Sequence, residues 1–137
     1  MTPLYVEINL WLPRIFVWGE SDCMTVLADW IHKNRGVDPM SEVRGKYNSY
    51  LSCQRVTGFF SDPVNVMDSY VKKAGLEINQ GAARRGDVGV LLCPSEGKLQ
   101  PVGGLCLGHN WAVKAPKGAT TLKPPQVLAS WDMAYEE

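Results

Sequence analysis

The sequence predicts an α+β fold, with N-terminal helices packed on a small antiparallel sheet or half-barrel. Two observations carry this prediction. Apolar residues recur at helical spacing in the first half, and the chain from about residue 86 onward consists of short β-rich segments separated by turns. There is no internal repeat, low-complexity tract or linker between the two halves. We therefore expect residues 1–137 to form a single domain.

The clearest helix follows Ser21. Ser21 is a good N-cap residue, and the adjacent Asp22 places a negative charge in the first turn, where the helix dipole favours it. Gly36 is a typical residue to end this helix. The apolar residues between them fall on one face: Cys23, Val26, Leu27, Trp30 and Ile31. The pattern predicts a helix that begins within two residues of Ser21 and packs its Val26, Trp30 and Ile31 side against the sheet.

Three further helices are expected. Asp62-Pro63 is an N-cap followed by proline in the first turn, and Gly75 ends the apolar stripe that follows. Residues 3–12 and 41–57 also have helical character. Four strands are predicted after them, at 87–93, 102–107, 111–114 and 120–122, with a turn at Pro94-Ser-Glu-Gly97.

The composition excludes several classes of protein. Apolar residues make up 45% and charged residues 20% of the 137 residues, which is ordinary for a globular protein. Lys plus Arg and Asp plus Glu both number 14, so no basic excess exists to bind a nucleic-acid backbone. No apolar run is long enough to predict a membrane span, and we expect no cleaved signal peptide because the first residues lack a basic start followed by an apolar segment.

The four cysteines are too few to predict a disulfide scaffold, and we expect reduced thiols in a protein made in a cytoplasm. Three of them, Cys53, Cys93 and Cys106, are interpreted as small core residues. The spacing Cys106-Leu-Gly-His109 resembles half of a zinc site but lacks a second pair of ligands. No phosphate-binding loop or His-Glu-x-x-His motif is present, so neither metal nor cofactor is predicted.

Cys23 is the residue most capable of chemistry. It lies at the start of a helix, where free N–H groups and the helix dipole stabilise a thiolate. The other interpretation is that Cys23 is the first small apolar residue of the core-facing stripe, and the neighbouring Asp22 charge disfavours a thiolate. His32 lies on the opposite side of the same helix and cannot be its base. His109 follows a predicted strand and is either a base brought to Cys23 or an ordinary turn histidine.

Several segments resemble the NlpC-type cell-wall cysteine peptidases, a papain-like superfamily. Phe16-Val-Trp-Gly-Glu-Ser-Asp-Cys23 resembles the family's nucleophile segment, and Arg85-Gly-Asp-Val88 resembles the Pro-Gly-Asp-Leu that opens its sheet. Val102-Gly-Gly-Leu-Cys-Leu-Gly108 resembles the strand that carries its catalytic histidine. The resemblance implies a papain-like fold with Cys23 as the counterpart of the nucleophile.

A small branch of this superfamily, found in tail-gene clusters of bacteriophages and gene-transfer agents, is more similar still. Its Trp-Gly-x-x-Asp-Cys helix start is followed by a turn similar to Thr-Gly-x-Asp-Pro, matched here by Arg35-Gly-Val-Asp-Pro39, and by Arg-Gly-x-Tyr, matched by Arg44-Gly-Lys-Tyr47. Pro125 to Trp131 is similar to the proline-led segment near the end of such chains. The order of the motifs implies a tail protein, located in the virion and made in the host cytoplasm.

The sequence departs from the family at the remaining catalytic positions. The place of the family's histidine is Val102, and its third polar residue falls near Lys114. Without a base, a cysteine has neither a proton acceptor nor an acid for the leaving group.

Two functions follow from this departure. The first is a structural tail-tip or tail-assembly protein, catalytically degenerate, whose partners are other tail proteins. The second is an active peptidoglycan endopeptidase with Cys23 as nucleophile and His109 as base. A host-directed phage protein that uses the same fold for inhibition is a third. Four aromatic residues outside the strongest helical stripes, Tyr5, Trp11, Phe59 and Phe60, are predicted to contribute to a partner surface.

Overall fold

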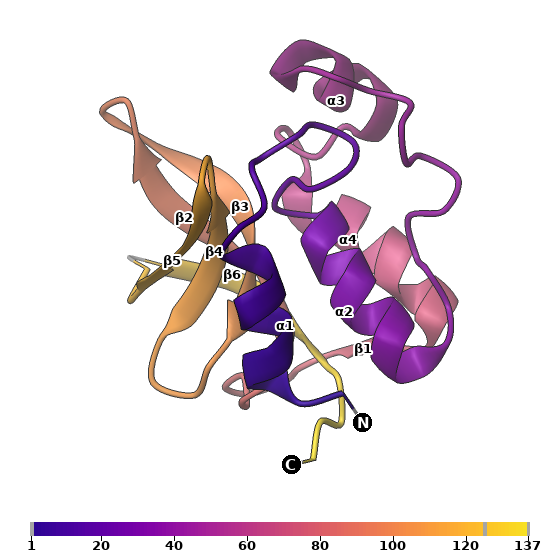
Figure 1. Ribbon diagram of the computed structural model, residues 1–137, viewed down its shortest axis with the longest axis vertical. Coiled ribbons are helices and arrows are strands. Elements are labelled where there is room, and N and C mark those ends of the chain that lie inside the picture. Colours follow the sequence, from indigo (N-terminus) through magenta and orange to yellow (C-terminus); the bar gives the residue numbers. More distant parts are fainter. Residues whose placement is uncertain (1, 125, 137) are drawn as a thin grey trace.

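The computed structural model describes residues 2–124 and 126–136. Four α-helices and a short 3-10 helix precede the six strands of an antiparallel sheet (Figure 1). The helices are α1 (Leu4–Trp11), α2 (Thr25–Arg35), α3 (Tyr50–Thr57), α4 (Pro63–Val71) and the 3-10 helix η1 (Lys72–Ala74). The strands are β1 (Glu77–Ile78), β2 (Val88–Ser95), β3 (Lys98–Cys106), β4 (Trp111–Ala115), β5 (Gly118–Leu122) and β6 (Gln126–Asp132). The predicted α+β class, with helices packed on an antiparallel sheet, is confirmed.

The start of α2 differs from the prediction. The helix begins at Thr25, four residues after Ser21, and Ser21 does not cap it. The Ser21 hydroxyl instead donates to the Ile15 carbonyl and accepts the Val17 N–H, so it stabilises the preceding loop. Asp22 supplies the cap: its Oδ1 accepts the N–H groups of Met24 and Thr25, and its own N–H donates to Thr25 Oγ1. The expected packing of Val26, Trp30 and Ile31 in the core is confirmed.

The helix expected over residues 41–57 forms only in its C-terminal half, as α3. Ser49 begins α3 with a capping box to Ser52. Residues 41–46 form turns, and Gly45 has φ +74, which ends any helical continuation there. The N–H of Gly45 binds the Gly19 carbonyl, so this segment is fixed against the loop before α2 rather than against itself.

The six strands lie in the sheet in the order β1-β6-β2-β3-β4-β5, and β2 to β5 correspond to the four predicted strands. The predicted turn between β2 and β3 is the two-residue connection Glu96-Gly97, and both residues have positive φ, as a type I′ turn requires. Strands β1 and β6 were not predicted. A register shift opposite Val90 and Leu91 interrupts the alternation of β6, and β1 has only two residues. The predicted C-terminal motif corresponds to β6, apart from Pro125, which lies outside the described residues.

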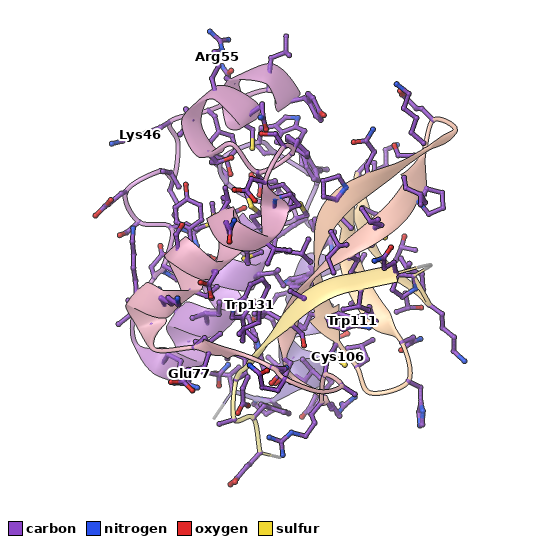
Figure 2. The ribbon with its side chains drawn as sticks, turned by 180° about the vertical axis from the view of Figure 1, so that it is seen from behind. Lys46, Arg55, Glu77, Cys106, Trp111 and Trp131 are labelled. Carbon is purple, nitrogen blue, oxygen red and sulfur yellow. The ribbon has the colours of Figure 1, made fainter. Side chains whose placement is uncertain are left out.

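The main core lies between the helices and one face of the sheet, and Trp131 of β6 is part of it (Figure 2). The opposite face carries a smaller cluster of Leu91, Cys106 and Trp111. The Trp111 ring lies over Gly89 of β2, where a Cβ would approach the ring atoms to 2.7 Å. The absence of a side chain at Gly89 therefore lets this indole pack closely against β2.

Two of the four residues proposed for a partner surface belong to the core. Trp11 and Phe59 are fully buried, so that prediction is wrong for them, whereas Phe60 is half-buried and Tyr5 is exposed. Cys53 and Cys106 are buried, as expected of core cysteines, and Cys93 is half-buried.

Candidate functional site

The turn that carries Cys23 is held by the buried carboxylate of Asp22. One oxygen accepts the two N–H groups that cap α2. The other accepts the Gly19 N–H at 2.9 Å and the Tyr47 hydroxyl at 2.7 Å. Burial, and then the charge of Asp22, raise the pKa of Tyr47, so this phenol remains a donor. Four donors converge on one side chain, which fixes the backbone on both sides of Cys23.

The motifs that gave the sequence resemblance form one unit around this carboxylate. Gly19 has φ +83, and a Cβ there would lie 2.4 Å from the carbonyl oxygen of Tyr47. Only glycine permits that approach. The Trp-Gly-x-x-Asp-Cys and Arg-Gly-x-Tyr segments are thus in direct backbone contact, although 25 residues separate Asp22 from Tyr47.

Arg44 joins the remaining motif to α2. Its guanidinium binds Asp38 through Nε at 2.6 Å and Asp29 through Nη2 at 2.8 Å, and it also donates to the Thr25 carbonyl. Burial alone would raise the pKa of Asp38, but the hydrogen bonds and charge of Arg44 outweigh burial and hold that pKa below its ordinary value. These contacts give the motif residues Asp38 and Arg44 a structural role.

Cys23 is buried against β3. A Cβ added at Gly103 would lie 2.7 Å from the Cys23 carbonyl oxygen, so the helix start and the strand are in contact at this point. Burial, and then the charge of Asp22, raise the pKa of Cys23 to about 12, and the Gly103 N–H opposes this shift only in part. The side chain is therefore a neutral thiol at physiological pH.

The structure does not bring His109 to Cys23. His109 is exposed in the turn between β3 and β4. Cys23 touches β3 at Gly103, and the strand runs about 10 Å further to Cys106 before that turn begins. Among the described residues, no hydrogen bond or charge interaction joins these two side chains. Val102, where the sequence resemblance places the peptidases' histidine, precedes Gly103 in β3.

Lys114, which the sequence resemblance places near the peptidases' third polar residue, is a buried cation with structural contacts. Its ammonium donates to the carbonyls of Arg14, Ala115 and Gly118, and it thereby connects the loop after α1 to the β4–β5 turn. Burial, and then the positive charge of Arg14, lower the pKa of Lys114. All three of its donors have acceptors, so none is directed toward Cys23.

A groove of about 420 Å³ lies beside Val102. Three aromatic rings form part of its wall: Trp18 meets Tyr50 and Phe60 edge-on, and the Tyr50 and Phe60 rings are stacked at 4.2 Å. The other side is the β2–β3 hairpin, which projects at the same end of the molecule as α3 in Figure 1. The residues that line the groove are Trp18, Tyr50, Phe60, Ser95, Glu96, Gln100, Pro101 and Val102.

Sequence reasoning did not identify this groove or the organising role of Asp22. The spacing Asp22-x-x-Thr25 is a helix-start signal that could have placed the cap one residue later. The groove has no local signal, since its residues come from three separated segments.

The family assignment comes from a comparison with family models. Residues 6–133 match the family described as Domain of unknown function (DUF6950). The chain belongs to this family. The DUF6950 match spans Cys23, His109, Lys114 and every residue of the groove. Neither a curated protein nor a solved structure matches the chain.

Within residues 2–124 and 126–136, no group of three or more His, Cys, Asp or Glu side chains could hold a metal ion. No helix in the same ranges is long and apolar enough to cross a membrane.

Proposed function

We propose that this protein is a structural component of a bacteriophage tail, built on an NlpC-type, papain-like fold in which Cys23 is not a nucleophile. The observation that carries the proposal is the state of Cys23. Its thiol is buried against Gly103, its pKa is raised to about 12, and the adjacent charge is the carboxylate of Asp22. A cysteine peptidase needs the opposite environment, in which an imidazole lowers the thiol pKa.

The arrangement of the motifs supports the fold part of this proposal. A cysteine just before a helix contacts a strand inside the sheet at Gly103, and the preceding residue, Val102, is the position at which the sequence resemblance places the peptidases' histidine. The partners would be other tail proteins, and the location would be the virion after synthesis in the host cytoplasm. The order of motifs across the chain is the support for this tail assignment.

Site-resolved alkylation tests the chemical part. Iodoacetamide labelling from pH 6 to pH 9, read by mass spectrometry, should modify Cys23 slowly throughout, since the thiolate is scarce and the sulfur is buried. Cys93 is the matched control, because it is half-buried and burial alone raises its pKa. We expect Cys93 to react faster than Cys23 at every pH.

A working enzyme would give a different result. Rapid labelling of Cys23 at pH 6 that is lost in His109→Ala would show a functional thiol–imidazole pair. Release of soluble fragments from purified peptidoglycan that disappears in Cys23→Ala would make the peptidoglycan endopeptidase the correct reading. Mass spectrometry of purified tails checks the location, and tails assembled without the chain would contradict the structural role.

A further inference from the structure

One edge of strand β3 has no partner strand over most of its length. On the side away from β2, β3 pairs with β4 only at Leu105 and Cys106. Residues 98–104 therefore have no partner strand on this side among the described residues, although Pro101, Gly103 and Gly104 are buried by other parts of the fold. Such an edge is a template for another extended chain.

The register identifies the groups on this edge. The type I′ turn makes Ser95 and Lys98 a hydrogen-bonded pair, so the next pair, Pro94 and Leu99, is a non-hydrogen-bonded one. Residues 99, 101 and 103 thus direct their main-chain groups away from β2. This agrees with the Gly103 N–H, which interacts with the Cys23 sulfur on that side.

The open positions are therefore few and defined. Leu99 offers an N–H and a carbonyl, while Pro101 offers a carbonyl alone because proline has no N–H. Leu99 is 52% exposed, whereas Pro101 is buried, although it lines the groove described above.

The aromatic groove runs beside the same part of the strand. Gln100, Pro101 and Val102 belong to both features. Glu96 is the one charged side chain among the groove residues, and no Lys, Arg or His lines it. A ligand rich in acidic groups would meet this carboxylate without a compensating cation.

We propose that the β3 edge and this groove together bind an extended segment of a partner protein, which adds as a strand beside Leu99 and Pro101. The segment carries alternating apolar side chains toward Trp18, Tyr50 and Phe60, and a Lys or Arg toward Glu96. This deepens the proposed structural role, because it names the kind of partner segment that the module would hold. An open strand edge favours a peptide over a saccharide, since main-chain N–H and carbonyl groups are complementary to it.

Selection of random decapeptides displayed on filamentous phage against the full-length chain tests the proposal. Enriched sequences should alternate apolar residues, include Lys or Arg, and lack Asp and Glu. Trp18 reports binding of a synthetic enriched peptide, because the other four tryptophans are buried. Its fluorescence should change on titration and the change should be absent in Trp18→Phe.

Leu99→Pro isolates the strand edge. It removes an N–H that points away from β2, so the β2–β3 hydrogen bonds remain, and Pro94 already occupies the opposite position. We expect about three- to tenfold weaker binding, the cost of one hydrogen bond, while the matched Leu99→Val binds as the wild type does. Glu96→Lys should weaken basic peptides by a similar factor.

Peptides methylated on alternate main-chain nitrogens provide a second measurement that needs no variant of the protein. Methylation of the nitrogens that face β3 should abolish binding. No enrichment, enrichment of acidic sequences, or full affinity after Leu99→Pro and after methylation would each overturn the proposal. Tighter binding of chitotetraose than of any peptide would overturn it in favour of a saccharide site. These outcomes leave the alkylation of Cys23 unaffected, so failure here and failure of the non-catalytic role are distinguishable.

Discussion

Asp22→Asn should destabilise the protein more than a change of one atom suggests. The amide keeps Oδ1 and its bonds to the Met24 and Thr25 N–H groups, but it places an NH₂ where Oδ2 meets Gly19 and Tyr47. The Tyr47 hydroxyl can rotate to accept from this NH₂. The Gly19 N–H has no such freedom and is left buried against another donor.

The expected cost follows from these contacts. One buried donor without an acceptor costs about 1–3 kcal/mol, and the remaining bonds lose their charged acceptor. We expect a total loss of roughly 2–4 kcal/mol in the free energy of unfolding, which is a large part of the ~5–15 kcal/mol typical of a domain. In urea, with a slope of about 2 kcal/mol per molar, the midpoint should fall by roughly 1–2 M.

Equilibrium unfolding by circular dichroism, under reducing conditions, measures this loss. Asp62→Asn is the matched control, because Asp62 also precedes a helix but its carboxylate is exposed and bonded to the Asn65 side chain. We expect the control to change stability by less than about 0.5 kcal/mol. Equal midpoints for the two variants would refute the central role given to Asp22. The pKa of Cys23 should also fall in Asp22→Asn, since the charge of Asp22 is the second cause of its elevation.

Two further perturbations test the neighbouring contacts. Gly103→Ala should lower the free energy of unfolding by about 1–3 kcal/mol, because the new Cβ would lie 2.7 Å from the Cys23 carbonyl and 2.8 Å from Leu27 Cδ1. Gly81→Ala is its control and should be close to neutral, because a Cβ at Gly81 has no atom within 4 Å. Equal thermal midpoints for the two variants would contradict the close packing of α2 on β3. Arg44→Met should cost roughly 1–3 kcal/mol at pH 7, between the values for exposed and buried ion pairs, and Arg55→Met on the exposed face of α3 is its control. The folded-state pKa of Asp38 is lowered, so its contribution to stability is present above the unfolded pKa of about 3.9 and is lost as the pH falls through the folded value. The difference in free energy of unfolding between wild type and Arg44→Met should therefore shrink below about pH 4. A difference that stays constant with pH would exclude the Asp38 pairing.

Local patterns predicted the elements whose signals lie within a few residues. The stripe of α2, the Asp62-Pro63 start of α4 and the β2–β3 turn are of this kind, and each is present in the structure. The helix predicted over residues 41–49 is absent because a contact distant in sequence, from Gly45 to Gly19, decides the conformation of this segment. The sequence also identified Cys23 and Asp22 as neighbours with opposing effects, but it could not show that Tyr47 would complete the carboxylate site. A contact across 25 residues has no periodicity to reveal it.

Cys23 has a structural role at the contact between α2 and β3, and this role needs no catalytic base. The main-chain N–H and carbonyl groups at the edge of a sheet need a hydrogen-bond partner or must be shielded by another part of the protein. The Gly103 N–H, on the side of β3 away from β2, interacts with the Cys23 sulfur. A small, weakly polar side chain suits this position, because the Cys23 backbone already lies within 2.7 Å of where a Gly103 side chain would begin. Beyond Gly103 toward the hairpin, Pro101 is buried and has no N–H to cover, whereas Leu99 is 52% exposed. A proline therefore separates the part of the β3 edge that Cys23 covers from the exposed part that we propose for binding. The residue that we propose as the counterpart of a peptidase nucleophile thus covers one end of this edge.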